Sequence, residues 1–227
     1  RALTAGPPQS DAFELAVTRL LESKTKARFE ALEALYLMPS PSARQCLVQA
    51  LKATRLNDPP AMRAVRRVFK MAEHRGDAEI WGLIARKFDT AKGTRYWQQP
   101  SAWSTGTRKH FRARVVRTLR RLADAENEAF ISMAVGLLLA YDATDAPLSA
   151  GAAGIRLRHG FSWLLYGNSS RYYQSLKRLT WHKVWRPAPD ADAQREEMYP
   201  ELWDRHPAAL IRLLRESRNE RVQHFAV

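Results

Sequence analysis

Three arginines on one side of a predicted helix carry the strongest chemical signal in the sequence. Seven Lys and Arg residues and no acid lie between Arg108 and Arg121. At 100° per residue, Arg114, Arg117 and Arg121 share one face of a helix over residues 107–122, which we call the arginine ridge. Such charges repel one another unless an external anion or acids of the neighbouring 124–145 segment compensate them. The ridge therefore predicts phosphate binding. Internal compensation is the alternative, from Asp124, Glu126, Glu128, Asp142 and Asp145.

A second segment, residues 160–187, interleaves aromatic and basic side chains. No Asp or Glu occurs between residues 146 and 189. Aromatic rings stack on nucleic-acid bases, while Lys and Arg neutralise phosphates. If the segment is helical, Trp181 and Trp185 lie on one side at i,i+4, away from a packing stripe over Tyr172–Leu179. Core packing is the alternative for any single ring. The residues that we expect on the ligand-facing side are Arg178, Trp181, Lys183 and Trp185.

A third basic stripe lies nearer the N-terminus. A helix is expected to begin at Asp58-Pro59-Pro60, because Pro is favoured in the first turn. Arg63, Arg67 and Lys70 lie opposite its apolar stripe and are further candidates for anion binding.

Signals for catalysis and metal binding are weak. The sequence contains no phosphate-binding glycine loop, no GxSxG, no HExxH and no paired CxxC. The six histidines show no short metal-ligand spacing, so we expect no metal and no cofactor. A DNA-processing enzyme would place an acid beside aromatic rings in a basic cleft, and Asp204 beside Trp203 is the nearest match. That single pair makes Asp204 a weak catalytic candidate.

Composition points to a soluble, basic protein that binds polyanions. The net charge is +14, with 37 Lys and Arg against 23 Asp and Glu, and such an excess attracts nucleic acid or acidic protein surfaces. One cysteine, Cys46, and the lack of a long apolar run predict a cytoplasmic location without a membrane span. The chain does not begin with Met and stops within an amphipathic pattern, so we expect it to belong to a longer protein.

The elements that position these residues are predicted to be helices. Apolar residues recur at 3-4 spacing, and Pro or Gly follow at helix-length intervals. The fold class is therefore all-α, with antiparallel helical pairs that stack as an irregular α-solenoid. We expect a helical-repeat domain over 1–186 with an inserted loop near 92–106, a connector over 187–198 and a further helical pair over 199–227.

The part of the chain from Ala61 to Tyr141 resembles bacterial HEAT-like helical proteins, in particular the helical region of WGR-domain, molybdate-metabolism-regulator-like proteins. The similarity rests on Ala61–Phe88, Thr107–Leu122 and Val135–Tyr141, which are hydrophobic and basic rather than catalytic. No WGR tripeptide occurs in the chain. The resemblance implies an α-solenoid segment that binds partners within a larger protein, and it implies no catalytic residue.

Together these observations predict a non-catalytic binding module for the nucleic-acid backbone. The first alternative is a protein-interaction scaffold whose basic ridges bind acidic surfaces of another chain or of another domain of the same chain. The second alternative is a helical-repeat DNA-processing enzyme. Salt-sensitive binding to random DNA or RNA favours the first interpretation, and binding that survives about 0.5 M salt favours protein docking.

Overall fold

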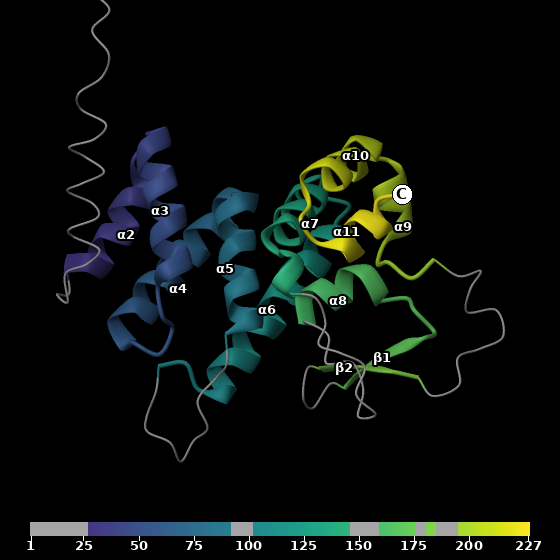
Figure 1. Ribbon diagram of the computed structural model, residues 1–227, viewed down its shortest axis with the longest axis horizontal. Helices are drawn as coiled ribbons and strands as arrows, with labels where there is room; N and C mark the ends of the chain where they lie inside the picture. Colours follow the sequence, from purple (N-terminus) through teal and green to yellow (C-terminus); the bar gives the residue numbers. More distant parts are fainter. Residues whose placement is uncertain (1–26, 92–101, 146–158, 176–179, 185–194) are drawn as a thin grey trace, which may run out of the picture.

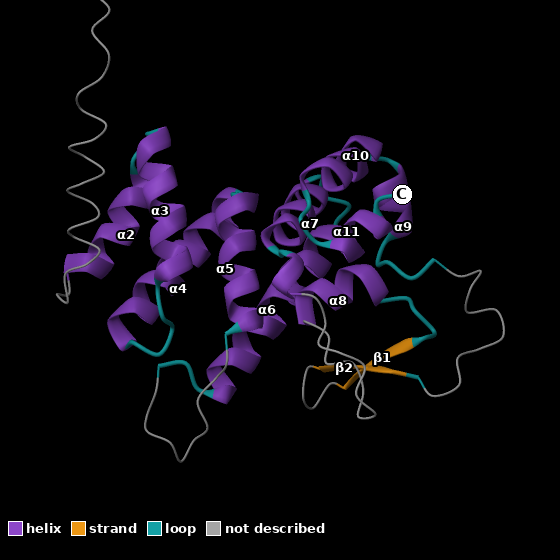
Figure 2. Cartoon of the chain, viewed as in Figure 1, coloured by secondary structure: helices purple, strands orange, loops and turns teal. Residues whose placement is uncertain are grey.

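A computed structural model describes residues 27–91, 102–145, 159–175, 180–184 and 195–227 of the chain. Helices dominate this part, and its strands form one short antiparallel hairpin (Figure 2). The all-α fold class is therefore confirmed. The elements are α2 (Ala27–Leu37), α3 (Pro41–Ala53), α4 (Pro59–Arg75), α5 (Ala78–Thr90), α6 (Thr105–Asp124), α7 (Ala129–Ala140), α8 (His159–Tyr166), β1 (Tyr172–Ser175), β2 (Thr180–Lys183), α9 (Pro200–Asp204), α10 (Pro207–Glu216) and α11 (Glu220–Phe225).

Local sequence explains where the early helices begin and end. The Ser40 hydroxyl accepts a bond from the Ala43 amide, and Pro41 occupies the first turn of α3. Gly76 ends α4 in the left-handed conformation at φ 65°, which is least costly for glycine. The Asp77 carboxylate then accepts a bond from the Ile80 amide at 3.3 Å and starts α5. The chain thus reverses between α4 and α5 within two residues.

Successive helices alternate between two rows. In one row α2 packs against α4, and in the other α3 packs against α5 and α5 against α7. Several helices also pack against their neighbour in sequence, for example α4 against α5 and α6 against α7. Helices α2 to α7 follow one another along the long axis of the molecule, and α8 to α11 lie together at the other end (Figure 1).

The closest contact between helices joins α5 to α7. A Cβ at Gly82 would lie 2.2 Å from the Gly136 carbonyl oxygen, and a Cβ at Gly136 would lie 2.2 Å from the Ala78 carbonyl oxygen. Only glycine fits at Gly82 and Gly136, because any larger residue would meet backbone rather than a movable side chain. The second row is therefore held together by direct backbone contact.

Aromatic rings fill the core between α4, α5 and α6. Phe88 lies 4.5 Å from Phe111 and 5.3 Å from Trp103, measured between ring centroids. Trp103 is fully buried, and its indole N–H donates to the Ala91 carbonyl. The last part of the predicted loop over 92–106 therefore belongs to the core through Trp103, and α6 already begins at Thr105. Residues 92–101 lie outside the described part.

The second half of the aromatic segment differs from the prediction. The helical assumption for residues 172–183 is wrong, because Tyr172–Ser175 and Thr180–Lys183 pair as antiparallel strands. Tyr, Thr and Trp side chains favour the extended backbone, and the helix α8 before them has already ended at Tyr166.

The C-terminal residues pack against the rest of the fold. In the predicted connector, the Met198 amide donates to the Leu164 carbonyl and the Asn168 amide donates to the Glu196 carbonyl, which ties residues 196–198 to α8 and the turn after it. Helix α10 packs against α7 and α11. Residues 199–227 therefore extend the helical core, as Figure 1 shows at the yellow end of the chain.

Candidate nucleic-acid interface

Helix α6 positions its basic side chains in three different settings. Arg112 is buried and forms an ion pair of 2.7 Å with Asp89. Arg114 is half-buried, and its Nε donates to Glu73 at 3.0 Å. Arg117 and Arg121 are exposed, and neither has an ion-pair partner among the described residues. The predicted ridge therefore exists as a stripe on α6, but its three members differ in how their charge is balanced.

The partner of Arg114 places α4 beside α6. The Glu73 carboxylate accepts bonds from Arg114 and from the Thr118 hydroxyl. One to two turns earlier in each helix, the Arg66 guanidinium lies 5.4 Å from the centre of the Phe111 ring. These contacts follow the same order along both helices, so α4 and α6 lie side by side and run in the same direction.

We call this shared surface the α4/α6 basic face. Its α4 side carries the predicted stripe, and all three of those side chains are exposed. Arg67 pairs with Glu33 at 3.0 Å, whereas Arg63 and Lys70 have no ion-pair partner within the part of the chain that the structure describes. Glu73 is the one acid within α4, its side chain is 9% exposed, and it is already engaged. The exposed cations of the face are Arg63, Arg66, Arg67, Lys70, Arg117 and Arg121.

The inner side of α6 faces a buried polar centre around Asp89. The Asp89 carboxylate accepts bonds from the Tyr141 hydroxyl at 2.8 Å and from the His159 and Gly160 amides at 2.9 and 3.1 Å. Burial alone would raise the pKa of Asp89, but the Arg112 charge and these donors hold it below its ordinary value. Asp89 thus caps the first turn of α8 and neutralises Arg112.

His159 belongs to the same centre. Its ring is buried, and its Nδ1 lies 3.0 Å from Nε2 of Gln174 in β1. Burial, opposed in part by the Asp89 charge, lowers the pKa of His159 to about 4. A neutral histidine therefore links α8 to the hairpin. No sequence pattern signals this centre, because Asp89, Tyr141 and His159 are far apart along the chain and meet only in the folded protein.

The acids proposed to compensate the arginine ridge have other partners. Asp124 accepts a bond from the Tyr199 hydroxyl, and Glu126 pairs with Arg205 at 2.9 Å. Asp142 and Asp145 both bind Arg86, at 2.9 and 2.6 Å. These four acids of the alternative therefore have partners other than the ridge, and Glu73 of α4 pairs with Arg114 instead.

The predicted aromatic surface is not formed as expected. Trp181 lies in β2 and is 3% exposed, so its assignment to a ligand-facing surface is wrong. The backbone of Lys183 pairs with Tyr172 at the other end of that strand. Arg178 and Trp185 lie outside the described residues. The exposed ring of the hairpin is Tyr173, which stacks on His182 with ring centroids 5.3 Å apart.

Asp204 does not stand in an aromatic cleft. Its side chain is 59% exposed and pairs with Arg195 at 2.8 Å, whereas the neighbouring Trp203 is fully buried. The two side chains thus point to different environments. Among the described residues, no group of three or more His, Cys, Asp or Glu could hold a metal ion. In the same part of the chain, every helix is too short or too polar to cross a membrane.

Comparison with known proteins finds no matching protein family, no matching curated protein and no matching solved structure.

Proposed function

We propose that this chain is a non-catalytic helical-repeat module that binds the nucleic-acid backbone through the α4/α6 basic face. The observation that carries the proposal is a set of exposed cations on two neighbouring helices that have no ion-pair partner among the described residues: Arg117 and Arg121 on α6, and Arg63 and Lys70 on α4. Helix α4 contains five Lys and Arg residues against one acid, and α6 contains seven against one. Much of the excess charge of the protein therefore belongs to this pair of helices.

The physical basis is release of counterions. Phosphates along a nucleic acid hold condensed cations, and each Lys or Arg that replaces one of them gains free energy at low salt. Exposed arginines that are not already paired lose no internal interaction when they bind a phosphate. Paired arginines, such as Arg112, would have to leave a carboxylate buried without a partner.

The two rows of helices support a solenoid architecture. In an α-solenoid each helical pair stacks on the preceding pair, which gives contacts between every second helix such as α3 with α5 and α5 with α7. This pattern agrees with the resemblance to bacterial HEAT-like proteins, and both suggest a binding segment of a larger protein. A single cysteine, Cys46, agrees with a cytoplasmic location.

The test compares two pairs of exposed arginines that contribute equal charge. Arg117→Gln/Arg121→Gln removes two cations from the basic face. The control, Arg55→Gln/Arg215→Gln, removes one exposed cation just after α3 and one from α10. Fluorescence anisotropy with random-sequence single-stranded and duplex DNA measures the affinity of each. We expect about tenfold weaker binding for the first variant at about 50 mM salt, and nearly unchanged binding for the second. Equal affinities would reject the proposed face.

A protein-interaction scaffold is the second candidate. Ile211 and Leu214 of α10 are 49% and 43% exposed and lie one turn apart, so the helix presents an apolar strip as well as charge. A partner that docks there would remain bound at about 0.5 M salt, whereas a complex with phosphates would dissociate. If the wild-type protein binds no DNA but keeps a protein partner at about 0.5 M salt, the scaffold is favoured.

A further inference from the structure

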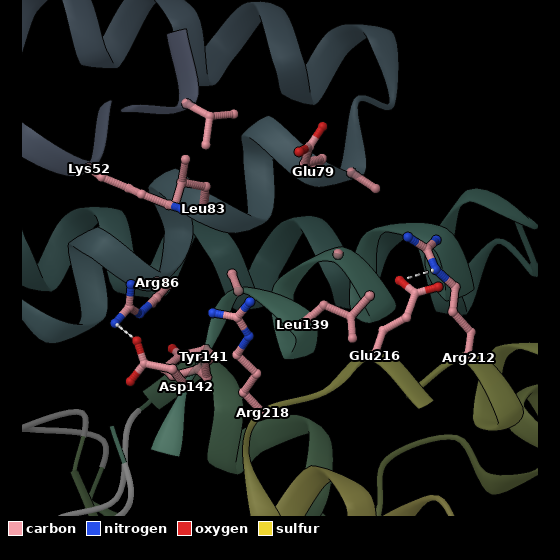
Figure 3. A pocket seen from close by; sticks show the side chains of 14 residues that line it. Lys52, Glu79, Leu83, Arg86, Leu139, Tyr141, Asp142, Arg212, Glu216 and Arg218 are labelled. Atoms are coloured by element: carbon pink, nitrogen blue, oxygen red, sulfur yellow. Dashed lines mark hydrogen bonds and ion pairs between the residues drawn. The ribbon is translucent and has the colours of Figure 1, made fainter. Parts of the chain in front are cut away.

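A pocket of about 620 Å³ lies between α3, α5, α7 and α10, remote from the charge pairs that join α4 to α6. Figure 3 shows its lining side chains. The volume is within the range of small-molecule sites in proteins. Val48, Leu83 and Leu139 supply its apolar side chains, and Ala78 and Gly136 belong to the close contact between α5 and α7. An apolar group can therefore rest on a rigid surface.

Every carboxylate in the lining is already engaged by an arginine. Glu79 pairs with Arg44 at 2.7 Å, and Glu216 pairs with Arg212 at 3.1 Å. Asp142 pairs with Arg86, which also binds the buried Asp145. The acids of the pocket consequently have little attraction left for a cationic ligand.

Two cations of the lining remain uncommitted. Among the described residues, neither Lys52 at the end of α3 nor Arg218 between α10 and α11 has a side-chain partner. In Figure 3 both lie in the same half of the view as Arg86, while the Arg212–Glu216 pair lies in the other half. An anion in that half would meet two cations that lose no existing bond.

The backbone around both cations is held in place. Arg218 lies between Ser217 and Asn219, which are both buried, and the side-chain amide of Asn219 donates to the Asp142 carbonyl at 3.0 Å. The Lys52 carbonyl accepts a bond of 2.9 Å from Lys87. Burial, reinforced by the Arg86 charge, lowers the pKa of Lys87 to about 8. The backbone that carries Lys52 and Arg218 is thus held in place, while both side chains are exposed.

We propose that this pocket binds a small organic anion, whose carboxylate, sulfonate or phosphate head lies between Lys52 and Arg218 and whose apolar body rests on Leu83 and Leu139. The anionic class follows from the two uncommitted cations, and the apolar body follows from the side chains beside them. A free inorganic anion would leave the apolar part of the lining in contact with water. This site is independent of nucleic-acid binding, because none of its lining residues belongs to α4 or α6.

The probe is 8-anilinonaphthalene-1-sulfonate, which combines one sulfonate with an apolar ring system, and its uncharged counterpart is N-phenyl-1-naphthylamine. The test variant is Lys52→Gln/Arg218→Gln. Its matched control is Arg55→Gln/Arg215→Gln, which removes two exposed cations close in sequence to the same positions but outside the lining. Circular dichroism and thermal melting verify that both variants remain folded, since this probe also binds partly unfolded chains.

We expect the test variant to raise the Kd of the sulfonate probe about tenfold, while the control stays within about twofold of wild type. The uncharged probe should bind both variants as it binds wild type, and Leu139→Ser should weaken both probes. Failure of wild type to bind the sulfonate, or equal binding by wild type and Lys52→Gln/Arg218→Gln, would overturn the proposal. DNA affinity measured on the same variants should not change, which separates this proposal from the proposed function.

Discussion

The inner and outer sides of α6 carry the same residue type in two different electrostatic settings. On the inner side, Arg112 is buried against Asp89, which also accepts bonds from Tyr141 and from the first amides of α8. On the outer side, Arg117 and Arg121 face solvent with no ion-pair partner among the described residues. Arg114 lies between these extremes because Glu73 of α4 engages it at the boundary.

This difference assigns separate roles to the two sides. A buried ion pair contributes little net stability compared with a well-packed apolar pair, but loss of one partner leaves an isolated buried charge at high cost. An exposed arginine costs little to remove and is available to an external anion. The inner side is therefore structural, whereas the outer side is available for binding.

The largest effect is expected from Asp89→Asn. The substitution removes the charge that neutralises the buried Arg112, so the free energy of unfolding should fall by about 3–5 kcal/mol. Urea unfolding monitored by circular dichroism measures the change. The double variant Asp89→Asn/Arg112→Met removes both charges and should recover part of the loss. If the double variant loses as much free energy of unfolding as Asp89→Asn and Arg112→Met lose in sum, the two residues are not coupled.

A pH dependence should follow from His159. Its pKa is about 4 in the folded protein, below the ordinary value of 6.5, so the unfolded chain binds the proton more tightly. Stability is therefore present in full above pH 6.5 and is lost as pH falls toward 4, by about 3 kcal/mol. His159→Gln should lack most of this loss in urea titrations between pH 7 and pH 4. His74→Gln, at an exposed position, serves as the control and should behave like wild type.

A smaller effect is expected at the boundary between the two sides. Arg114→Gln removes the bonds to Glu73 but leaves that carboxylate its contact with Thr118 and partial access to water. The free energy of unfolding should fall by about 1–2 kcal/mol. A loss as large as that of Asp89→Asn would mean that Glu73 is as isolated from water as Asp89.

The smallest change in stability is expected for Arg117→Gln and Arg121→Gln. Both side chains are exposed and unpaired in the described part of the chain, so each substitution should alter the free energy of unfolding by less than about 0.5 kcal/mol. Thermal melting beside wild type measures it. A marked destabilisation would show that these arginines hold the fold together and would remove the contrast between the two sides of α6.

Much of the helical framework could be predicted because its signals are local. Gly76 and Asp77 mark a helix end and a helix start by conformation and capping, and the structure has both. The 100° periodicity also identified the exposed sides of Arg117 and Arg121. These inferences need only the spacing of residues within one helix.

The rest depends on contacts between distant residues. No local pattern links Arg112 to Asp89 or Arg114 to Glu73, so the sequence could not identify these two acids as the partners of α6. The hairpin was missed because aromatic and apolar residues over Tyr172–Lys183 fit a helix stripe as well as two short strands, and pairing between the strands decides the outcome. The burial of Trp181 follows from that pairing.

The salt dependence of DNA binding tests the central claim most directly. For duplex DNA, log K falls with log salt concentration with a slope of about −0.9 for each phosphate contact. If Arg117 and Arg121 each bind a phosphate, Arg117→Gln/Arg121→Gln should make the slope less steep by about 2. Arg114→Gln and Arg55→Gln/Arg215→Gln should keep the wild-type slope. An unchanged slope for Arg117→Gln/Arg121→Gln would contradict the assignment of the outer side of α6 to nucleic-acid binding.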